Sequence, residues 1–362
     1  MKKIFLRAYD KVNLGDDLFI RTIVNRYPDV KFYFWSDKIN QTNFKDLKNL
    51  CVIDENSLFF EWINRINGSL KGRIKRFNEN ICSASVYIGG SILMQYDNWR
   101  YFTEWLLDIA NRTNFFILGA NFGPFSDENY RKEINTVFHK MKDVCFRDNY
   151  SKGLFLNNEN VRYAPDILFD YSIPKKTIKK KQIFISVIDC NKENKIKKYN
   201  EDYINNMVNL IKQYIFDDYK IILCSFCKYE GDLEVILDIK NRVGSLGNKI
   251  QVLSYEGTNY NDILINLSES EFVIATRFHA IMLSLKAQKP VLPLIYSDKT
   301  KNVLNDLNFN SLTYDIRSKD IWNYEAIKKS MTKYYDLDDY YIQDSRLHFK
   351  VLDELIYKGV KK

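Results

Sequence analysis

The amino-acid sequence predicts an α/β protein of two domains, each with a largely parallel β-sheet between layers of helices. Short apolar runs of strand length alternate with longer segments of helical periodicity along most of the chain. A basic, proline-containing stretch at 173–181 lacks this periodicity, and the same alternation starts again after it. The length of 362 residues also exceeds what one core of ordinary size accommodates. Two Rossmann-like domains facing each other across a cleft are therefore expected.

The first domain is expected over residues 1–172. Its strands are predicted from apolar runs at 4–9, 31–36, 51–54, 85–88, 115–118, 144–147 and 161–164. Helices are predicted between them, notably at 16–26, 99–112 and 129–142. In the last of these, five apolar residues fall at helical spacing, which predicts one buried face: Tyr130, Ile134, Val137, Phe138 and Met141.

The second domain is expected over residues 182–335. Strands are predicted at 183–188, 220–224, 250–253, 272–276 and 291–295, and helices at 202–216, 233–243, 260–267 and 280–286. The stretch 173–181 is interpreted as an interdomain linker, and a membrane-binding basic segment is the alternative. The aromatic-rich remainder, 336–362, is expected to form a helical tail that packs back on the first domain.

The composition restricts the classes of partner. A net charge of +8, from 54 Lys+Arg against 46 Asp+Glu, favours anionic partners such as phosphorylated metabolites or lipid headgroups, although a lysine-rich composition explains most of it. No nucleic-acid-binding module is recognisable, so nucleic acid is not expected as a partner. The first residues lead directly into a charged loop and no apolar run reaches spanning length, which predicts a cytoplasmic protein with membrane contact only at its surface.

Several classes of active site are not indicated. The sequence has no GxGxxG, Walker, HExxH or GxSxG element, which argues against nicotinamide redox chemistry, phosphate-loop hydrolysis, zincin proteolysis and the α/β-hydrolase triad. Cys224 and Cys227 have CxxC spacing, but no second pair of ligands stands near them. Most of the six cysteines lie in apolar runs and are expected to be buried structural thiols, and no metal site and no cofactor are expected.

The run TRFHA at 276–280 is the strongest functional signal. It places Arg277 and His279 where a predicted buried strand ends and a predicted helix begins. An arginine, a titratable imidazole and the free N–H groups of a helix start together suit an anionic, oxygen-rich ligand. His279 is interpreted as a general acid, with a structural histidine as the alternative. His139 and His348 have no such neighbours and are expected to be structural.

A second unusual loop, NLGDD at 13–17, follows the first predicted strand. Gly15 permits a close backbone approach. Asp16 or Asp17 is expected either to cap the following helix or to orient and deprotonate a sugar hydroxyl, and both alternatives stay open.

Three further strand-end loops carry candidates of the same kind. Gly89, Gly90 and Ser91 expose backbone N–H groups, which can donate hydrogen bonds to an anion or a sugar oxygen. The alternative is a tight turn.

Asn121, in a loop fixed by Gly123 and the following proline, is expected to hydrogen-bond a ligand. Asp148 follows Arg147 and is equally suited to cap the next helix, while Asp166 is expected to be structural.

The order of these loops resembles that of the polysaccharide pyruvyl transferase family. The resemblance extends from about residue 13 to about residue 310, and the Arg-x-His-Ala element is its most specific part. It includes the YSDK run at 296–299, where the family often places a lysine before a helix. The resemblance implies a glycosyltransferase-B-like fold in which the enolpyruvyl unit of phosphoenolpyruvate moves onto a sugar as a cyclic ketal.

The resemblance also implies partners and a place of action. The acceptor is expected to be a sugar of a bacterial surface polysaccharide or exopolysaccharide, or of its lipid-linked precursor, held on undecaprenyl diphosphate. Phosphoenolpyruvate serves as co-substrate and no further cofactor is expected. The enzyme is then expected at the inner face of the cell membrane.

Residue roles follow from the same resemblance. The second domain is expected to hold the donor and the first domain the acceptor, with His279 and Arg277 catalytic and Asp16 as the base. The donor-binding residues are expected to be Arg277, His279, Lys299, Ser297, Gly123 and Asn121. The acceptor-binding residues are expected to be Asn13, Gly15, Asp17, Gly89, Gly90, Ser91 and Asp148.

Two other functions fit the same architecture. A glycosyltransferase would use the arginine and histidine to bind a nucleotide-sugar donor. A non-catalytic glycan-binding relative would have kept the fold without the chemistry, and the intact pair of Arg277 and His279 argues against it.

Overall fold

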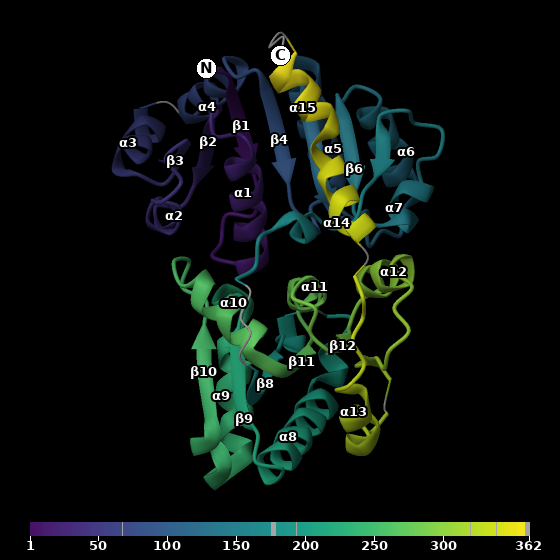
Figure 1. Cartoon of the computed structure of the whole chain (residues 1–362). Helices are drawn as coiled ribbons and strands as arrows, with labels where there is room; N and C mark the ends of the chain where they lie inside the picture. Colours follow the sequence, from purple (N-terminus) through teal and green to yellow (C-terminus); the bar gives the residue numbers. More distant parts are fainter. Residues whose placement is uncertain (67, 175–178, 193, 319, 338, 359–362) are drawn as a thin grey trace. The chain divides into compact units, whose positions relative to one another are not determined.

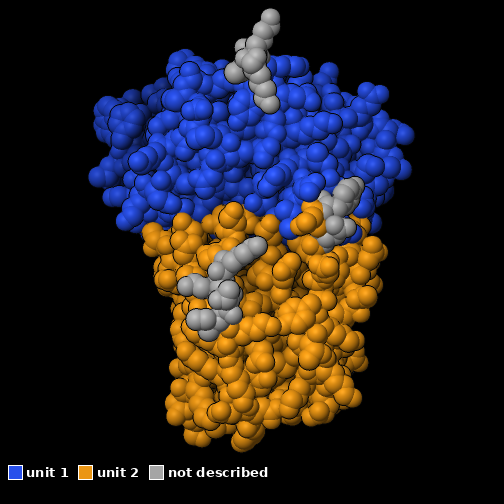
Figure 2. All heavy atoms as spheres, viewed as in Figure 1, with its two compact units in different colours: residues 1–10, 18–170, 340–362 blue, residues 11–17, 171–339 orange. Residues whose placement is uncertain are grey.

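The computed structural model describes residues 1–358 except residues 67, 175–178, 193, 319 and 338. The middle of the predicted linker, 175–178, therefore lies outside the described residues. The chain divides into two compact units (Figure 2). Unit 1 comprises Met1–Asp10, Leu18–Asp170 and Tyr340–Lys362, and unit 2 comprises Lys11–Asp17 and Tyr171–Asp339.

Unit 1 contains a seven-stranded, fully parallel sheet in the order β3-β2-β1-β4-β5-β6-β7 (Figure 1). The strands are β1 (Lys3–Arg7), β2 (Lys31–Ser36), β3 (Leu50–Asp54), β4 (Ala84–Ile88), β5 (Phe115–Ala120), β6 (Asp143–Phe146) and β7 (Val161–Tyr163). The direction in which successive strands are added reverses between β1 and β4. In open α/β sheets such a switch point leaves a crevice at the carboxyl ends of the strands.

The helices of unit 1 alternate with these strands. They are α1 (Leu14–Arg26, whose first turn belongs to unit 2), α2 (Ile39–Asn43), α3 (Leu58–Ile66), α4 (Leu70–Asn80), α5 (Trp99–Arg112), α6 (Glu128–Phe138) and α7 (Asn149–Gly153). The predicted helix at 129–142 ends four residues early, because the chain turns at His139 before entering β6. Met141 is buried in that turn, which explains why the sequence pattern continued past the helix end.

The last part of the chain packs on unit 1. It consists of α14 (Asp339–Ser345), a 3-10 turn (Arg346–Phe349) and α15 (Lys350–Tyr357). The Tyr27 hydroxyl donates to Asp353 at 2.6 Å, and the Arg26 guanidinium contacts the same carboxylate. His348 is fully buried, with Nε2 2.9 Å from the Pro165 carbonyl oxygen, and burial lowers its pKa to about 3.

Unit 2 contains a six-stranded parallel sheet in the order β10-β9-β8-β11-β12-β13. The strands are β8 (Lys180–Ser186), β9 (Lys220–Ser225), β10 (Ile250–Ser254), β11 (Ser270–Ala275), β12 (Val291–Ile295) and β13 (Tyr314–Asp315). Its α-helices are α8 (Asn200–Phe216), α9 (Asp232–Val243), α10 (Tyr260–Glu269), α11 (Phe278–Lys286), α12 (Asp298–Asp306) and α13 (Tyr324–Ser330). The switch point of this sheet lies between β8 and β11.

Strands β9 to β12 match the predicted apolar runs, because the sheet is largely buried under helices. The short, half-buried β13 was not predicted. The first strand differs: β8 begins at Lys180, inside the stretch expected to be linker, and ends at Ser186. Among the described residues, no helix has the length and apolar content needed to span a bilayer.

Candidate functional site

Arg277 and His279 lie at the switch point of the unit 2 sheet. β11 ends at Ala275, and α11 begins at Phe278 with Arg277 as its N-cap residue. The strand end is fixed to β8, because Thr276 N–H donates to the Ser186 carbonyl at 3.1 Å. The two residues predicted from the TRFHA run therefore lie where open parallel sheets bind their ligands.

The Arg277 guanidinium is held by two acidic residues that sequence reasoning missed. Its Nε donates to both carboxylate oxygens of Asp232 at 3.1 Å, Nη2 contacts the same carboxylate, and Nη1 contacts Glu230. Burial alone would lower the pKa of Arg277, but the Asp232 and Glu230 carboxylates raise it well above its usual value. Arg277 therefore stays charged, and any bound anion has to compete with these partners.

The two acidic partners differ in their surroundings. The Asp232 side chain is fully buried and also accepts hydrogen bonds from Phe226 N–H and Cys227 N–H at 3.0 Å. The Glu230 side chain is 34% exposed. Gly231 between them adopts φ +85°, a left-handed conformation that directs both side chains toward the arginine from one turn. The run EGD at 230–232 before a predicted helix was the available sequence signal.

The loop at 13–17 belongs to unit 2 and begins α1. The Asn13 side chain accepts a hydrogen bond from Gly15 N–H at 3.1 Å, so the capping role falls to Asn13 and not to Asp16 or Asp17, which lie in the first turn. The Asp17 carboxylate accepts a hydrogen bond from the Tyr255 hydroxyl at 2.7 Å, and both side chains are buried. Asp17 thereby fixes the loop to unit 2, and its expected contact with an acceptor stays a prediction.

The same loop packs directly on His279. A Cβ atom added to Gly15 would lie 1.7 Å from His279 Nδ1, a separation that real side chains do not adopt. On its other side, the half-buried imidazole contacts the Phe278 ring edge to face, with centroids 5.5 Å apart. Only glycine at position 15 leaves the imidazole in this position. Asp16, which follows Gly15 in the chain, is half-buried.

Ser297 and Lys299 lie at the start of α12, which follows β12, the strand next to β11. The Lys299 ammonium lies 5.5 Å from the centre of the Tyr296 ring. The Ser297 and Thr300 hydroxyls are buried and have no hydrogen-bond partner among the described residues. Buried hydroxyls of this kind usually bind water or a ligand. Thr300 was not among the predicted residues.

In unit 1, three of the predicted strand-end loops meet around Arg147. Its Nη1 donates to Asp166 at 3.1 Å and its Nη2 to the Asn121 side-chain oxygen at 3.0 Å. A Cβ atom on Gly90 would lie 2.4 Å from Nη2, so the glycine makes room for the guanidinium. The Asn121 amide nitrogen donates to the Gly123 carbonyl at 3.3 Å. These groups are buried and bond one another, and ligand roles for Asn121, Gly123 and Gly90 stay predictions.

The remaining predicted residues of unit 1 are also engaged locally. Asp148 caps α7, accepting hydrogen bonds from Ser151 N–H and Oγ at 2.8 Å, which favours the capping alternative. Ser91 Oγ lies 3.5 Å from the Asn121 side-chain oxygen, and Gly89 adopts φ 156°. Ligand roles for these three residues stay predictions.

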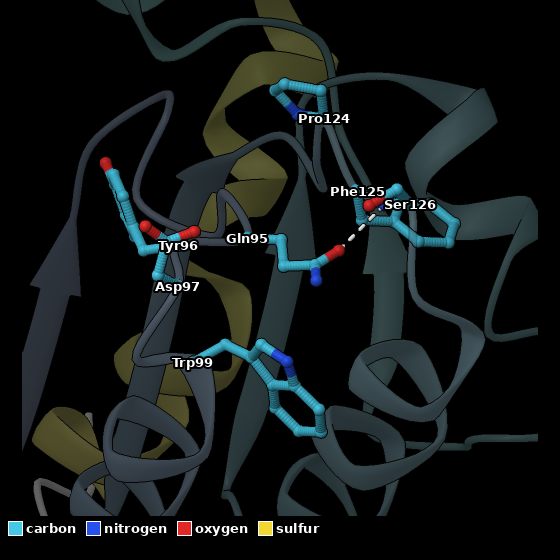
Figure 3. A pocket seen from close by; sticks show the side chains of 7 residues that line it. All are labelled: Gln95, Tyr96, Asp97, Trp99, Pro124, Phe125 and Ser126. Carbon is cyan, nitrogen blue, oxygen red and sulfur yellow. Dashed lines mark hydrogen bonds between the residues drawn. The ribbon is translucent and has the colours of Figure 1, made fainter.

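Sequence reasoning missed a pocket further along the same loops (Figure 3). It has a volume of about 310 Å³ and is formed by the β4–α5 and β5–α6 connections. Its lining consists of Gln95, Tyr96, Asp97, Trp99, Pro124, Phe125 and Ser126. The Gln95 side-chain oxygen accepts hydrogen bonds from Ser126 N–H at 2.7 Å and Asp127 N–H at 3.0 Å. This fixes the amide with its nitrogen directed into the open space (Figure 3).

The cysteines and the acidic residues are further candidates for redox or metal chemistry within the described residues. All six cysteines are free, and burial raises the pKa of the Cys227 thiol to about 12. Within the described part of the chain, no cluster of three or more His, Cys, Asp or Glu side chains has the arrangement of a metal site.

Comparison with known proteins identifies a family and a fold. The family model for polysaccharide pyruvyl transferase matches residues 13–298, as the resemblance predicted. UDP-GlcNAc 2-epimerase from Methanocaldococcus jannaschii, in complex with UDP-GlcNAc and UDP, has a TM-score of 0.62 at 12% identity, covering 99% of this chain and 100% of that chain. The S. aureus MnaA–UDP structure has a TM-score of 0.60 at 14% identity, covering 99% and 97%.

A third solved structure is similar. Anabaena Alr3699/HepE in complex with UDP and glucose has a TM-score of 0.57 at 12% identity, covering 98% of this chain and 95% of that chain. At such low identity these likenesses establish the fold alone. They confirm the predicted class of two parallel-sheet, Rossmann-like α/β domains of the glycosyltransferase-B type.

Proposed function

This chain belongs to the polysaccharide pyruvyl transferase family, and we propose that it transfers the enolpyruvyl unit of phosphoenolpyruvate to two hydroxyls of a sugar as a cyclic ketal. The acceptor is a sugar of a bacterial surface polysaccharide or of its lipid-linked precursor, reached at the inner face of the cell membrane. The observation that carries the proposal is His279 at the switch point of unit 2, braced by Gly15 and next to the charged Arg277.

The reaction adds one proton to the methylene carbon and one to the departing phosphate, and it removes one proton from each of two sugar hydroxyls. His279 gives a proton to the methylene carbon of phosphoenolpyruvate, which becomes a methyl group and leaves an oxocarbenium-like centre. One sugar hydroxyl attacks this carbon and loses its proton to Asp16. The bond from the same carbon to the phosphate oxygen then breaks and a second hydroxyl closes the ring. The proton of this second hydroxyl passes to the departing phosphate. The products are the ketal and inorganic phosphate.

The donor's carboxylate is proposed to bind Arg277 in place of Glu230. Asp232 is fully buried and accepts two backbone N–H bonds, so it stays on one edge of the guanidinium. Glu230 is partly exposed and contacts only Nη1, so a ligand carboxylate can replace it without leaving a buried charge unpaired. Two parallel hydrogen bonds from a guanidinium suit this group.

The donor's phosphate is proposed to bind at the start of α12. The Ser297 and Thr300 hydroxyls have no partner among the described residues, and Lys299 supplies a positive charge in the same turn. The free N–H groups of the first turn of a helix bind phosphate oxygens in many proteins.

The acceptor sugar is proposed to bind at the pocket of unit 1. The fixed Gln95 amide and the Asp97 carboxylate can hydrogen-bond sugar hydroxyls, and the half-exposed Tyr96 offers a flat ring for stacking. Its mostly polar lining suits a sugar better than an apolar ligand.

The alternative function is a glycosyltransferase that uses a nucleotide-sugar donor, or an epimerase that acts on a nucleotide-sugar. Similar structures that contain UDP or UDP-GlcNAc favour it. Thermal denaturation in the presence of each donor separates the two. Phosphoenolpyruvate should raise the melting temperature, and with a lipid-linked glycan it should release phosphate and add a pyruvyl group to the glycan. Stabilisation and turnover by UDP- or CMP-sugars alone would support the alternative.

A further inference from the structure

Exposed apolar side chains gather on the two helices α3 and α4, which lie beside β2 and β3 in Figure 1. In α3, Leu58 is 82% exposed, and three further large side chains are each about 60% exposed: Phe59, Trp62 and Ile66. Phe77 in α4 and Ile81 directly after it are also exposed. Scattered surface leucines need no explanation, but a set of this size on two neighbouring helices, with three aromatic residues, usually marks a binding surface.

The exposed side of α3 is not needed for the core. Leu58, Phe59, Trp62 and Ile66 fall at helical spacing and share one side of the helix. The inward side carries Phe60 and Ile63, which are buried against Phe5 and Trp35 of the sheet. The apolar arc of α3 is therefore wider than the part that the core covers, and folding explains only its buried part.

α4 repeats this arrangement with added positive charge. Its Leu70 and Ile74 pack against the same small core as α3, and the two helices contact each other. Phe77 follows Leu70 and Ile74 at helical spacing but is 67% exposed, and Arg73 and Arg76 are also exposed. The outward sides of both helices therefore turn away from one shared core.

The charge of this hairpin is positive at its surface. Between Leu58 and Asn80 there are five basic residues, namely Arg65, Lys71, Arg73, Lys75 and Arg76, against two acidic ones, Glu61 and Glu79. Glu79 is buried and paired with Arg7 and Arg112, so it does not offset the surface charge. Lys75 pairs with Glu55 and Arg76 with Asp108, so Arg65, Lys71 and Arg73 carry most of this charge.

We propose that the α3–α4 hairpin binds the surface of an anionic lipid bilayer. Trp62 and its apolar neighbours enter the boundary between headgroups and acyl chains, while the basic side chains contact the headgroups. An amphipathic, aromatic and basic helical surface without spanning length is the pattern of interfacial binding. The proposal does not depend on pyruvyl transfer, although it would bring the protein to a lipid-linked acceptor.

A second copy of the chain fits this surface less well. A two-fold interface would bring the same basic residues of both copies together, and like charges in contact are destabilising. The linker at 173–181, the alternative membrane contact predicted from the sequence, is basic but has no aromatic residue.

Co-sedimentation of the full chain with vesicles tests the proposal. The protein should bind vesicles that contain phosphatidylglycerol and should bind pure phosphatidylcholine vesicles much less. Trp62→Ser combined with Phe59→Ser should weaken binding about tenfold or more, because two large apolar side chains no longer leave water. The double variant Phe216→Ser and Ile321→Ser, at two positions of unit 2 that are more exposed still, is the control.

Two further measurements keep the outcome decisive. Unchanged melting temperatures establish that the exposed substitutions leave the fold intact, and Arg73→Glu with Arg76→Glu should abolish the preference for phosphatidylglycerol. Equal vesicle binding by the hairpin variant and its control overturns the proposal. So does light scattering that shows a dimer which the hairpin variant alone dissociates, since the surface then binds a second copy. Loss of transfer activity with intact vesicle binding would concern the proposed function only.

Discussion

At the scale of single residues, Gly15 is the most demanding position of the site. Gly15→Ala places a methyl group 1.7 Å from His279 Nδ1, so the imidazole has to move. We predict that kcat for pyruvyl transfer falls about 100-fold, because a displacement of about 1 Å of a catalytic group has that effect. Gly153→Ala, where a Cβ meets nothing within 4 Å, is the control. An unchanged kcat in Gly15→Ala would mean that His279 does not act from this position.

The acidic partners of Arg277 allow a separate prediction about donor binding. Glu230→Gln removes the competing charge from a partly exposed pair worth about 1 kcal/mol, so the KM for phosphoenolpyruvate should fall about fivefold. Arg277→Lys should raise the KM for phosphoenolpyruvate about tenfold or more. An ammonium group lacks the two edges with which a guanidinium binds Asp232 and the donor carboxylate at the same time.

Steady-state kinetics measures both effects, and Glu256→Gln, in an exposed pair with Lys228, is the control. A higher KM in Glu230→Gln would show instead that Glu230 helps to position Arg277.

His348 predicts how stability depends on pH. Its pKa is about 3 in the folded protein, so it stays neutral there, whereas in the unfolded chain it takes up a proton below about pH 6.5. Acid therefore favours the unfolded state, and each pH unit below about 6.5 lowers the free energy of unfolding by about 1.4 kcal/mol.

Urea denaturation measures this contribution. Between about pH 6.5 and about pH 5, the free energy of unfolding of the wild type should fall by about 2 kcal/mol more than that of His348→Gln. His139 is exposed, and His139→Gln should show the same pH dependence as the wild type. Parallel pH dependence in wild type and His348→Gln would contradict a neutral, buried His348.

At the scale of elements, the start of α12 yields a prediction that separates binding from folding. Thr300→Val removes a buried hydroxyl that has no partner among the described residues, so the melting temperature should stay unchanged or rise. The KM for phosphoenolpyruvate should rise about tenfold or more, because a hydrogen bond to a charged phosphate is lost. Thr332→Val, at an exposed site, is the control for both measurements. A large loss of stability without a change in KM would assign Thr300 to the core.

The elements also show what sequence patterns capture. Strands such as β5 and β12 are buried on both faces, so their sequences are uninterrupted apolar runs and were predicted nearly to the residue. The α3–α4 hairpin was missed. α3 has one broad apolar arc but only nine residues, and α4 contains Gly72 among its lysines and arginines, which lowers its helix propensity.

At the scale of the whole molecule, the strand-end loops were predictable and their partners were not. Glycine and aspartate after apolar runs identified the loops at 13–17 and 89–91, and an arginine and a histidine in the same position identified the loop at 276–280. The loop at 13–17 belongs to unit 2 because of contacts such as that between Asp17 and Tyr255, which are far apart in the sequence. The pairing of Arg277 with Asp232 depends on the same kind of contact, which no local pattern contains.

The identity of the transferred group is the central claim for the whole molecule. Its most direct measurement is the mass spectrum of a glycan acceptor after reaction with phosphoenolpyruvate in D2O. If a solvent-derived proton is added to the methylene carbon, the glycan should gain a pyruvate ketal with one deuterium in its methyl group, together with one released phosphate. A glycan that stays unmodified with phosphoenolpyruvate but gains a sugar from a nucleotide-sugar would contradict the account.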